Sequence, residues 1–311
     1  MAFIKNRKIY YIIAIAFIVI GITVGMVRGF NMGIDFTGGT MMQIDMGQKV
    51  EQSAIKDVLE KHGVEASIVF SGENNKEVII KTVSALDTEA RKEIISDMTT
   101  TFSLEDKDFL SIQEFGPSVG EMLKVNAIKA LLIASIGMLI YIVVRFEWKF
   151  GIAAIVATLH DVLVLIAFYG LFGVTVNNPF IAALLTVVGY SINDTIVVFD
   201  RIRENSVLYR KRDVSTLIND SINQTLSRSI MTSATTLLVI LPLFIFVSAE
   251  IREFLIPLLI GVSVGTYSSI FICSPVYYES MKKVGVSKYK EKQKKLDKSK
   301  AKEKRNAGIQ K

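Results

Sequence analysis

The sequence has very few of the residues on which disulfide, metal and cofactor chemistry depends. Its 311 residues include one cysteine, Cys273, and two histidines, His62 and His160. One cysteine cannot form a disulfide within the chain, and Cys273 is expected to be a small packing residue in an apolar run. Two histidines are too few for a histidine-based metal site, and neither a Gly-rich phosphate loop nor zinc-ligand spacing occurs. We therefore expect no cofactor, no metal and no nucleotide hydrolysis by this chain.

Charge is missing from several long stretches of the chain. Half of the residues are apolar, a share that soluble domains also reach. Nearly uncharged runs of about 18 or more residues, however, are typical of membrane helices, because such runs can cross about 30 Å of hydrocarbon. The expected spans are residues 9–27, 126–144, 150–172, 180–199, 229–248 and 254–273.

The first apolar run follows the basic residues Lys5, Arg7 and Lys8, an arrangement that also occurs in secretion signals. The run 9–27 is longer than a usual signal core, and no Ala-x-Ala-like cleavage site follows it. We expect a retained first helix that directs the following segment across the membrane.

Basic residues predict the orientation of the six spans. With residues 1–8 inside, the inner segments hold 24 of the 36 Lys and Arg residues, including those of the tail 274–311. The outer loop 173–179 has none, and the loop 249–253 has only Arg252. This distribution follows the positive-inside rule, so we expect a multi-pass protein of the bacterial cytoplasmic membrane with both termini in the cytoplasm.

The segment 28–125 is expected to form a small α+β domain outside. Between residues 31 and 124 it carries 9 basic and 17 acidic residues. Its hydrophobic patterns give the order strand, helix, strand, strand, helix, strand, which is the split ferredoxin-like pattern. Asp87 or Thr88 is expected to cap the second helix. The expected elements are strands 41–46, 66–70, 77–83 and 109–115, and helices 51–62 and 87–102.

The tail 274–311 is rich in Lys beyond Met281. It is expected to solubilise and orient the chain, and contact with anionic membrane lipids or with ribosomal RNA stays open.

Four ionisable residues fall inside the expected spans: Lys129, His160, Asp161 and Asp194. Each costs about 2.5–3.5 kcal/mol on insertion scales, so such residues usually face a partner or a cavity. Lys129 lies near a span end and can extend its ammonium toward water. Asp161 lies near the bilayer middle and is either a proton site or a polar packing residue. Adjacent helical residues point about 100° apart, so His160 is not expected to pair with Asp161.

Asp194 is the sharper candidate for proton transport. It lies in the inner half of its span among the polar residues Ser191, Asn193 and Thr195. Arg228 opens the next span from the same membrane side. A carboxylate and a guanidinium at matching depth can pair, and they separate when the acid takes a proton, which would couple structure to the proton gradient. A static salt bridge between helices is the alternative.

Three segments resemble motifs of one known family. They are Gly33–Thr40, Gly189–Asn205 and Ser227–Leu237. They are similar to the opening, fourth-helix and fifth-helix motifs of the SecF family, and the resemblance extends over nearly the whole chain to about residue 280. The first segment supplies the motif residues Gly33, Asp35, Phe36, Gly38 and Gly39.

The resemblance implies a subunit of the bacterial protein-export machinery. SecF pairs with SecD, and the pair resembles one resistance-nodulation-division transporter split into two chains. It uses protons to draw an unfolded polypeptide off the SecYEG channel after the SecA motor has pushed it. Asp194 and Arg228 fall on positions implicated in proton transport, Asp161 lies in a polar patch, and SecD is expected to add a further carboxylate. The segment 31–124 resembles the exported-side domain.

Two other functions stay open at this point. One is a small-molecule exporter of the same superfamily, although such pumps usually carry two repeats of six spans. The other is a passive membrane scaffold in which Asp194 has only a structural role.

Overall fold

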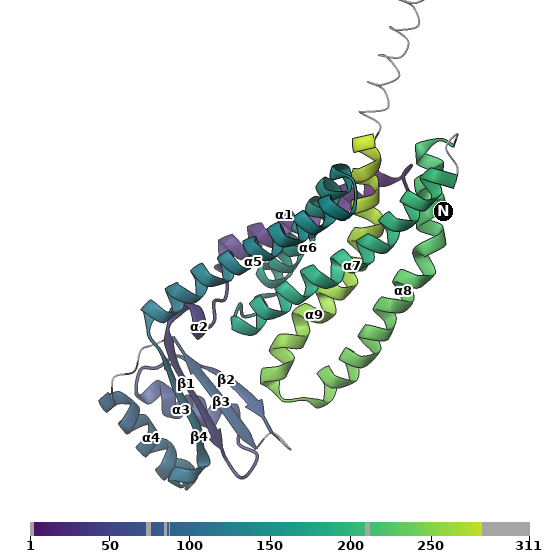
Figure 1. The fold of residues 1–311 in the computed structure, drawn as a ribbon. Helices are drawn as coiled ribbons and strands as arrows, with labels where there is room; N and C mark the ends of the chain where they lie inside the picture. Colours follow the sequence, from purple (N-terminus) through teal and green to yellow (C-terminus); the bar gives the residue numbers. More distant parts are fainter. Residues whose placement is uncertain (1–2, 73–75, 84–85, 87, 209–211, 282–311) are drawn as a thin grey trace, which may run out of the picture.

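The computed structural model describes residues 3–72, 76–83, 86, 88–208 and 212–281. An elongated bundle of long helices carries a small domain of strands and two helices at one end (Figure 1). The chain enters the bundle first, leaves it for the small domain, and then returns for the remaining long helices.

Six helices in the described part of the chain are long and apolar enough to cross a membrane, which confirms the predicted number of spans. The last of them continues from α9 through a π-helical turn, η3 (Ser269–Cys273), to Met281. The tail predicted from residue 274 is therefore helical at its start, and its remainder from 282 onward lies outside the described residues. The long helices are α1 (Arg7–Arg28), α5 (Pro117–Arg145), α6 (Trp148–Phe172), α7 (Asn178–Leu208), α8 (Val214–Phe246) and α9 (Ala249–Ser268).

Much of the segment 200–228, expected as a connection between spans, is helical. At about 1.5 Å per residue, the 31 residues of α7 reach about 46 Å, well beyond the hydrocarbon thickness. Asp213 caps α8 by accepting hydrogen bonds from the backbone N–H groups of Ser215 and Thr216. The amide of Asn205 joins the two helices by donating to Ser221 Oγ at 2.8 Å. Polar residues thus extend α7 and α8 beyond the predicted spans as a helical hairpin.

Glycines allow α1 to pack closely against α6. Gly21 and Gly25 are two of the three buried residues of α1, and they face Ala167 and Gly170 of α6. A Cβ atom placed on Gly170 would lie 2.7 Å from the carbonyl oxygen of Gly21. The spacing Gly-x-x-x-Gly lets two helix backbones approach closely in a membrane.

The small domain has the predicted order of elements. Each predicted boundary that falls on a described residue lies within two residues of the observed one. Of the two expected caps of α4, Asp87 lies outside the described residues, and Thr88 is the first residue of the helix itself. The four-stranded sheet is antiparallel with the order β2-β3-β1-β4, so β3 separates β1 from β2. The elements are β1 (Gly39–Asp45), α3 (Gln52–Lys61), β2 (Ser67–Ser71), β3 (Glu77–Thr82), α4 (Thr88–Phe102) and β4 (Phe109–Phe115), with short helices α2 (Ile34–Thr37) and η2 (Asp106–Asp108).

The two faces of this sheet have different neighbours. Ile44 and Ile80 point to the face covered by α3 and α4, where they form the core of the domain with Ile55 and Ile94. Residues alternate between the faces of a strand. Lys81, next to Ile80, is therefore on the opposite face, which lies against the N-terminal ends of α7 and α9.

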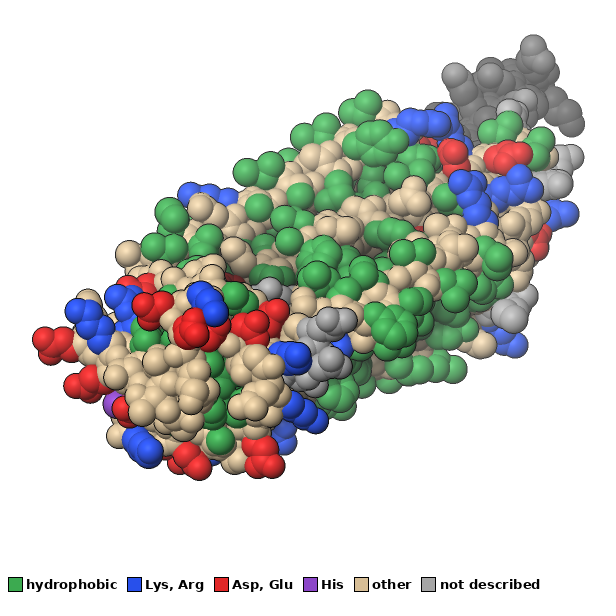
Figure 2. Space-filling model, turned by 90° about the horizontal axis from the view of Figure 1, so that it is seen from below, with side chains coloured by type: hydrophobic (Ala, Val, Ile, Leu, Met, Phe, Trp, Pro, Cys, Tyr) green, Lys and Arg blue, Asp and Glu red, His purple; other side chains and the backbone are tan. Residues whose placement is uncertain are grey.

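The surface fits a chain that lies in a membrane. Hydrophobic side chains cover the middle of the elongated molecule, and charged side chains gather at its two ends (Figure 2). Only 6% of the apolar window of α5 and 11% of that of α8 are buried within the chain.

We expect the substitution Gly21→Leu to separate α1 from α6, because the leucine would overlap the backbone of α6 at Ala167. Overpacking of this kind costs about 1–3 kcal/mol, so the melting temperature of the purified chain should fall by about 3–10 °C. Gly137→Leu is the matched control, since nothing lies within 4 Å of a Cβ atom at Gly137. Equal melting temperatures for the two variants would contradict the close packing.

Candidate functional site

Asp161 lies at the centre of a polar cluster in the membrane bundle. It projects from α6, is 0% exposed, and accepts hydrogen bonds from three side chains. Ser191 of α7 and Ser268 of α9 both donate to its Oδ2 atom, at 2.5 and 2.9 Å. His160 contacts its Oδ1 atom through Nδ1 at 3.0 Å. Both carboxylate oxygens therefore have partners, and three helices meet at this side chain.

The expectation that His160 and Asp161 do not pair was wrong. Their Cα–Cβ bonds diverge, but the imidazole ring is long enough to turn back toward the carboxylate of its neighbour. The ring also stacks near Tyr267 of α9, with 6.0 Å between the ring centroids. The other ring nitrogen, Nε2, is buried without a hydrogen-bond partner among the described residues.

Asp194 lies one helical turn farther along α7 than Ser191, on the same face of the helix. It is 2% exposed. The hydroxyl groups of Thr266 on α9 and Ser229 on α8 lie next to its carboxylate. Within the described part of the chain, neither Oδ2 of Asp194 nor Oγ of Ser229 has a partner at hydrogen-bond distance. The carboxylate of Asp194 therefore lacks a partner on one oxygen, in contrast to the carboxylate of Asp161.

Arg228 is near Asp194 but not in contact with it. The guanidinium is close enough to attract the carboxylate electrostatically, yet the ion pairs among the described residues do not include this pair. Arg228 is exposed and lines an open hollow of about 950 Å³ between the C-terminal part of α7 and the N-terminal half of α8. The structure thus shows this pair in a separated arrangement.

The other polar residues predicted around Asp194 divide between the two sides of α7. Ser191 and Thr195 are buried at 1% exposure, and Thr195 Oγ1 lies 3.0 Å from Ser269 Oγ. Asn193 is exposed on the outside of α7, so the structure does not bring it to the cluster.

The hydroxyl groups at the end of α9 and the start of η3 were not found from the sequence. Thr266, Ser268 and Ser269 face Asp194, Asp161 and Thr195, respectively. The π-helical turn η3 begins at Ser269, and Ser274 Oγ donates to the carbonyl oxygen of Ser269 at 3.0 Å. Such turns often occur at functional sites. The sequence does contain a signal for them, because several small hydroxyl residues lie close together in an otherwise apolar span.

The motif Gly33–Thr40 lies where the bundle meets the small domain. Asp35 accepts a hydrogen bond from the backbone N–H of Asn178 at 2.8 Å, at the first residue of α7. Phe36 is buried, and its carbonyl oxygen would lie 2.7 Å from a Cβ atom on Gly120 of α5. Gly33 donates its backbone N–H to the carbonyl oxygen of Val176 at 2.7 Å. The motif therefore joins the start of the domain to α5 and α7.

Two glycines of this motif have backbone conformations that other residues rarely adopt. Gly38 has a φ angle of 81° and Gly39 one of 146°. A Cβ atom on Gly39 would also overlap the carbonyl oxygen of Thr82 on β3. Glycine is needed here so that α2 can turn directly into β1.

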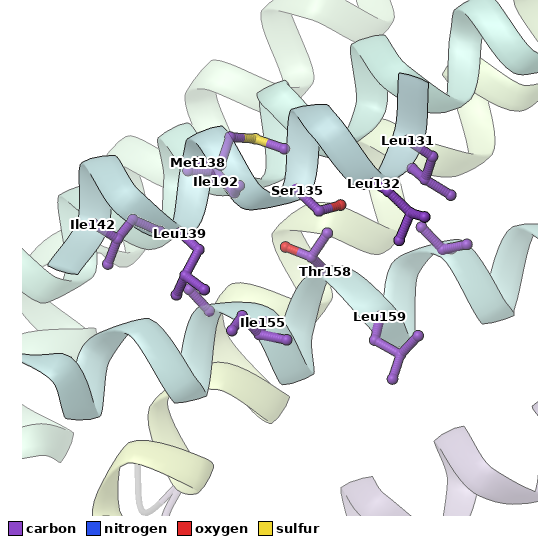
Figure 3. A pocket seen from close by; sticks show the side chains of 12 residues that line it. Leu131, Leu132, Ser135, Met138, Leu139, Ile142, Ile155, Thr158, Leu159 and Ile192 are labelled. Carbon is purple, nitrogen blue, oxygen red and sulfur yellow. The ribbon is translucent and has the colours of Figure 1, made fainter. Parts of the chain in front are cut away.

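A second cavity, of about 210 Å³, lies between α5 and α6 (Figure 3). Its walls are mostly leucine and isoleucine, and Ser135 and Thr158 lie between the two helices. Asp161 and Asp194 are absent from its lining. This cavity is separate from the carboxylate cluster.

Comparisons with known proteins agree with this arrangement. The model of the C-terminal region of the SecD/SecF protein export membrane proteins matches residues 94–283, and that of the SecD/SecF GG motif matches residues 25–50. The protein translocase subunit SecF of Haemophilus influenzae is 38% identical over 277 residues, which cover 89% of this chain and 85% of that protein. The chain belongs to the SecF family.

Other members and relatives support the assignment of this SecF-family chain. The translocase subunit SecF of Sebaldella termitidis is 39% identical, over 88% of this chain and 90% of that one. The crystal structure of SecDF from Thermus thermophilus superposes with a TM-score of 0.78 at 38% identity, over 91% of this chain and 39% of that one. A SecDF structure in a super-membrane-facing form gives a TM-score of 0.69 at 35% identity, over 94% of this chain and 40% of that one.

The chain is thus a SecF-like subunit of protein translocase and a multi-pass membrane protein. Its relatives are translocase subunits, which disfavours a small-molecule exporter. In SecDF relatives, the part similar to this chain is continuous with additional sequence, so the chain is related to SecD-containing proteins.

The two serines on Asp161 generate a prediction about stability. Ser191→Ala or Ser268→Ala alone leaves one donor on Oδ2, so each should cost only about 0.6–1 kcal/mol. The double variant leaves that buried oxygen without a donor and should cost more than the sum of the two. Thermal unfolding of the purified chain measures the difference.

Ser263→Ala is the control, because its exposed hydroxyl bonds only to Leu259 within its own helix. A double variant whose loss merely equals the sum would show that the serines do not share the carboxylate.

Proposed function

We propose that this chain works with SecD to use the proton gradient for completing the export of unfolded polypeptides through SecYEG after the SecA step. Asp194 binds and releases the proton, Arg228 responds to its charge, and Asp161 organises the helices around it. No nucleotide hydrolysis by this chain takes part.

The observation that carries this proposal is the difference between the two buried carboxylates. Asp161 has a partner on each oxygen, so the loss of its charge would weaken several hydrogen bonds at once. Asp194 keeps Oδ2 without a partner in a buried place. An unpaired carboxylate in hydrocarbon is costly, and taking a proton removes most of that cost. Asp194 is therefore the better proton carrier of the two.

The hollow beside Arg228 supports proton access from the inner side. It is open, and its lining includes the charged side chains of Asp200, Arg201, Glu204 and Arg228. Water in such a hollow would reach the region where α7 and α8 come together. The proton path would then run from the hollow past Arg228 to Asp194.

The proposed step depends on the electrostatic attraction between Asp194 and Arg228. When Asp194 is charged, it attracts Arg228 and draws α8 toward α7; when it is neutral, the attraction is lost. One charge that crosses 100 mV releases about 2.3 kcal/mol, enough to shift an equilibrium between two conformations that differ by a few kcal/mol. In this proposal, the separated arrangement of Asp194 and Arg228 is assigned to the neutral state.

Partnership with SecD follows from the SecDF relatives. The chain aligns to 36% of the SecDF of Thermus thermophilus. The long apolar faces of α5 and α8 are largely uncovered within the chain, which leaves room for a partner in the membrane. SecD would supply a further carboxylate to the proton path.

The small domain is proposed to be ferredoxin-like and to lie on the exported side. Its antiparallel order β2-β3-β1-β4 with two helices on one face supports the fold. The positive-inside distribution supports the location, with residues 1–8 and the tail 274–311 in the cytoplasm, span 9–27 first, domain 28–125 outside, and spans within 126–273.

We expect Asp194→Asn to be made and inserted normally but to abolish proton-dependent export. Asparagine keeps the size and hydrogen-bonding capacity of aspartate but cannot change charge. Arg228→Lys should retain partial activity at most, since lysine lacks the planar guanidinium. Export in cells, with and without a protonophore, measures the effect.

Asp220→Asn is the matched control, because this aspartate is bound to Arg212 in the inner extension of α8. A passive scaffold predicts wild-type export by Asp194→Asn. A static salt bridge predicts that exchanging the two residues, Asp194→Arg with Arg228→Asp, restores export. Either result would exclude Asp194 as the proton carrier.

Orientation gives a further prediction. A cysteine at the exposed position Asp57 of α3 should react with an impermeant maleimide in intact cells, whereas one at the exposed position Ser206 should react only after the membrane is opened. Cys273 is 0% exposed and should stay unlabelled. Labelling of the Ser206 site in intact cells would reverse the proposed topology.

A further inference from the structure

The small domain is held to the bundle by an ion pair far from the carboxylate cluster. Lys81 on β3 donates from Nζ to both carboxylate oxygens of Glu253 on α9, at 2.9 and 3.1 Å. Asn177, just before α7, donates its side-chain amide to the same carboxylate. Its own oxygen accepts from the backbone N–H of Phe180 at 3.0 Å, which fixes the amide orientation. Strand, helix and loop therefore share one carboxylate.

This ion pair is partly shielded from water. The side chains of Lys81 and Glu253 are 20% and 26% exposed. The adjoining cavity, of about 180 Å³, is also lined by Met41, Phe115 and Pro179. Shielding of this kind weakens the screening that makes fully exposed pairs nearly neutral in energy.

The ion pair matters because Glu253 lies on α9, the helix that also contacts the two buried aspartates. Asp35 and the motif around it connect the domain to α5 and α7, whereas Lys81 connects it to α9. The same helix carries Thr266 and Ser268, which face Asp194 and Asp161. About thirteen residues, or roughly 20 Å of helix, separate Glu253 from Thr266. A displacement of α9 at the carboxylates would therefore reach the sheet through Glu253.

We propose that Lys81 and Glu253 are positioning residues that anchor the exported-side domain to α9 and transmit the movement of this helix to the domain. The anchor itself rests on the geometry above, whereas its role in export rests on the proposed proton-coupled function. Asn177 holds the Glu253 carboxylate in the orientation that Lys81 needs.

The test uses the full chain with SecD in membranes, with Cys273 replaced by serine. Spin labels at Asp57 on α3 and at Ser248 before α9 report the distance between the small domain and the helix. Both positions tolerate a label, because Asp57 is exposed and the side chain of Ser248 caps no N–H group. Lys81→Glu or Glu253→Lys should broaden this distance distribution and lower export about fivefold at normal protein levels. Lys92→Glu, an exposed change of the same type on α4, should do neither.

The exchange Lys81→Glu with Glu253→Lys tests whether the two residues act through their ion pair. It should restore a narrow distance distribution and most of the export, although the amide of Asn177 then faces a lysine. Single variants that behave like the wild type, or an exchange as defective as the single variants, would overturn the anchor. If Asp194→Asn exports normally while the exchange still rescues the single variants, the proton mechanism fails and the anchor stands.

Discussion

The cost of placing a carboxylate in hydrocarbon governs the interior of this chain. An aspartate at the middle of the bilayer is tolerated only when other groups approach it. Asp161 obtains these groups from two further helices, because Ser191 comes from α7 and Ser268 from α9. The helices must then pack closely enough for short hydroxyl side chains to reach. Gly265 of α9 allows this close packing, because a Cβ atom at this position would lie only 3.0 Å from the Cβ atom of Ser191.

The two buried carboxylates lie on neighbouring helices and differ in their hydrogen bonding, since Asp161 has a partner on each oxygen and Asp194 has none on Oδ2. Asp161 fixes α6, α7 and α9 relative to one another, and so provides a rigid frame. Asp194 faces α8, which is less buried than α6, α7 and α9. In the proposed mechanism, α8 can move when the charge of Asp194 changes. In the proposed mechanism, Asp194 supplies the response to protons, and the frame around Asp161 gives that response a direction.

The sequence predicts the parts of this fold that depend on local patterns. Uncharged runs indicated the six spans, and the alternation of apolar and polar residues indicated the strands. Both patterns arise because burial favours apolar side chains at regular positions along an element. Asp161 and Asp194 stood out because a charge in an apolar run is unusual. Contacts such as Lys81–Glu253 join residues 172 positions apart and arise from tertiary packing alone. The helical extension 200–208 was missed because it is rich in charged residues and follows the hydrophobic run that indicated the span.

The packing of α1 on α6 also bears on how the chain is made. The glycine face of α1 fits α6, but 119 residues lie between the end of one helix and the start of the other. Ribosomes add about 5–20 residues per second, so α1 waits in the bilayer for at least about six seconds before α6 begins to emerge. During that time its glycines face lipid or an insertion factor, and the small domain is synthesised and can fold. The bundle can therefore close only after the small domain at one of its ends has been synthesised.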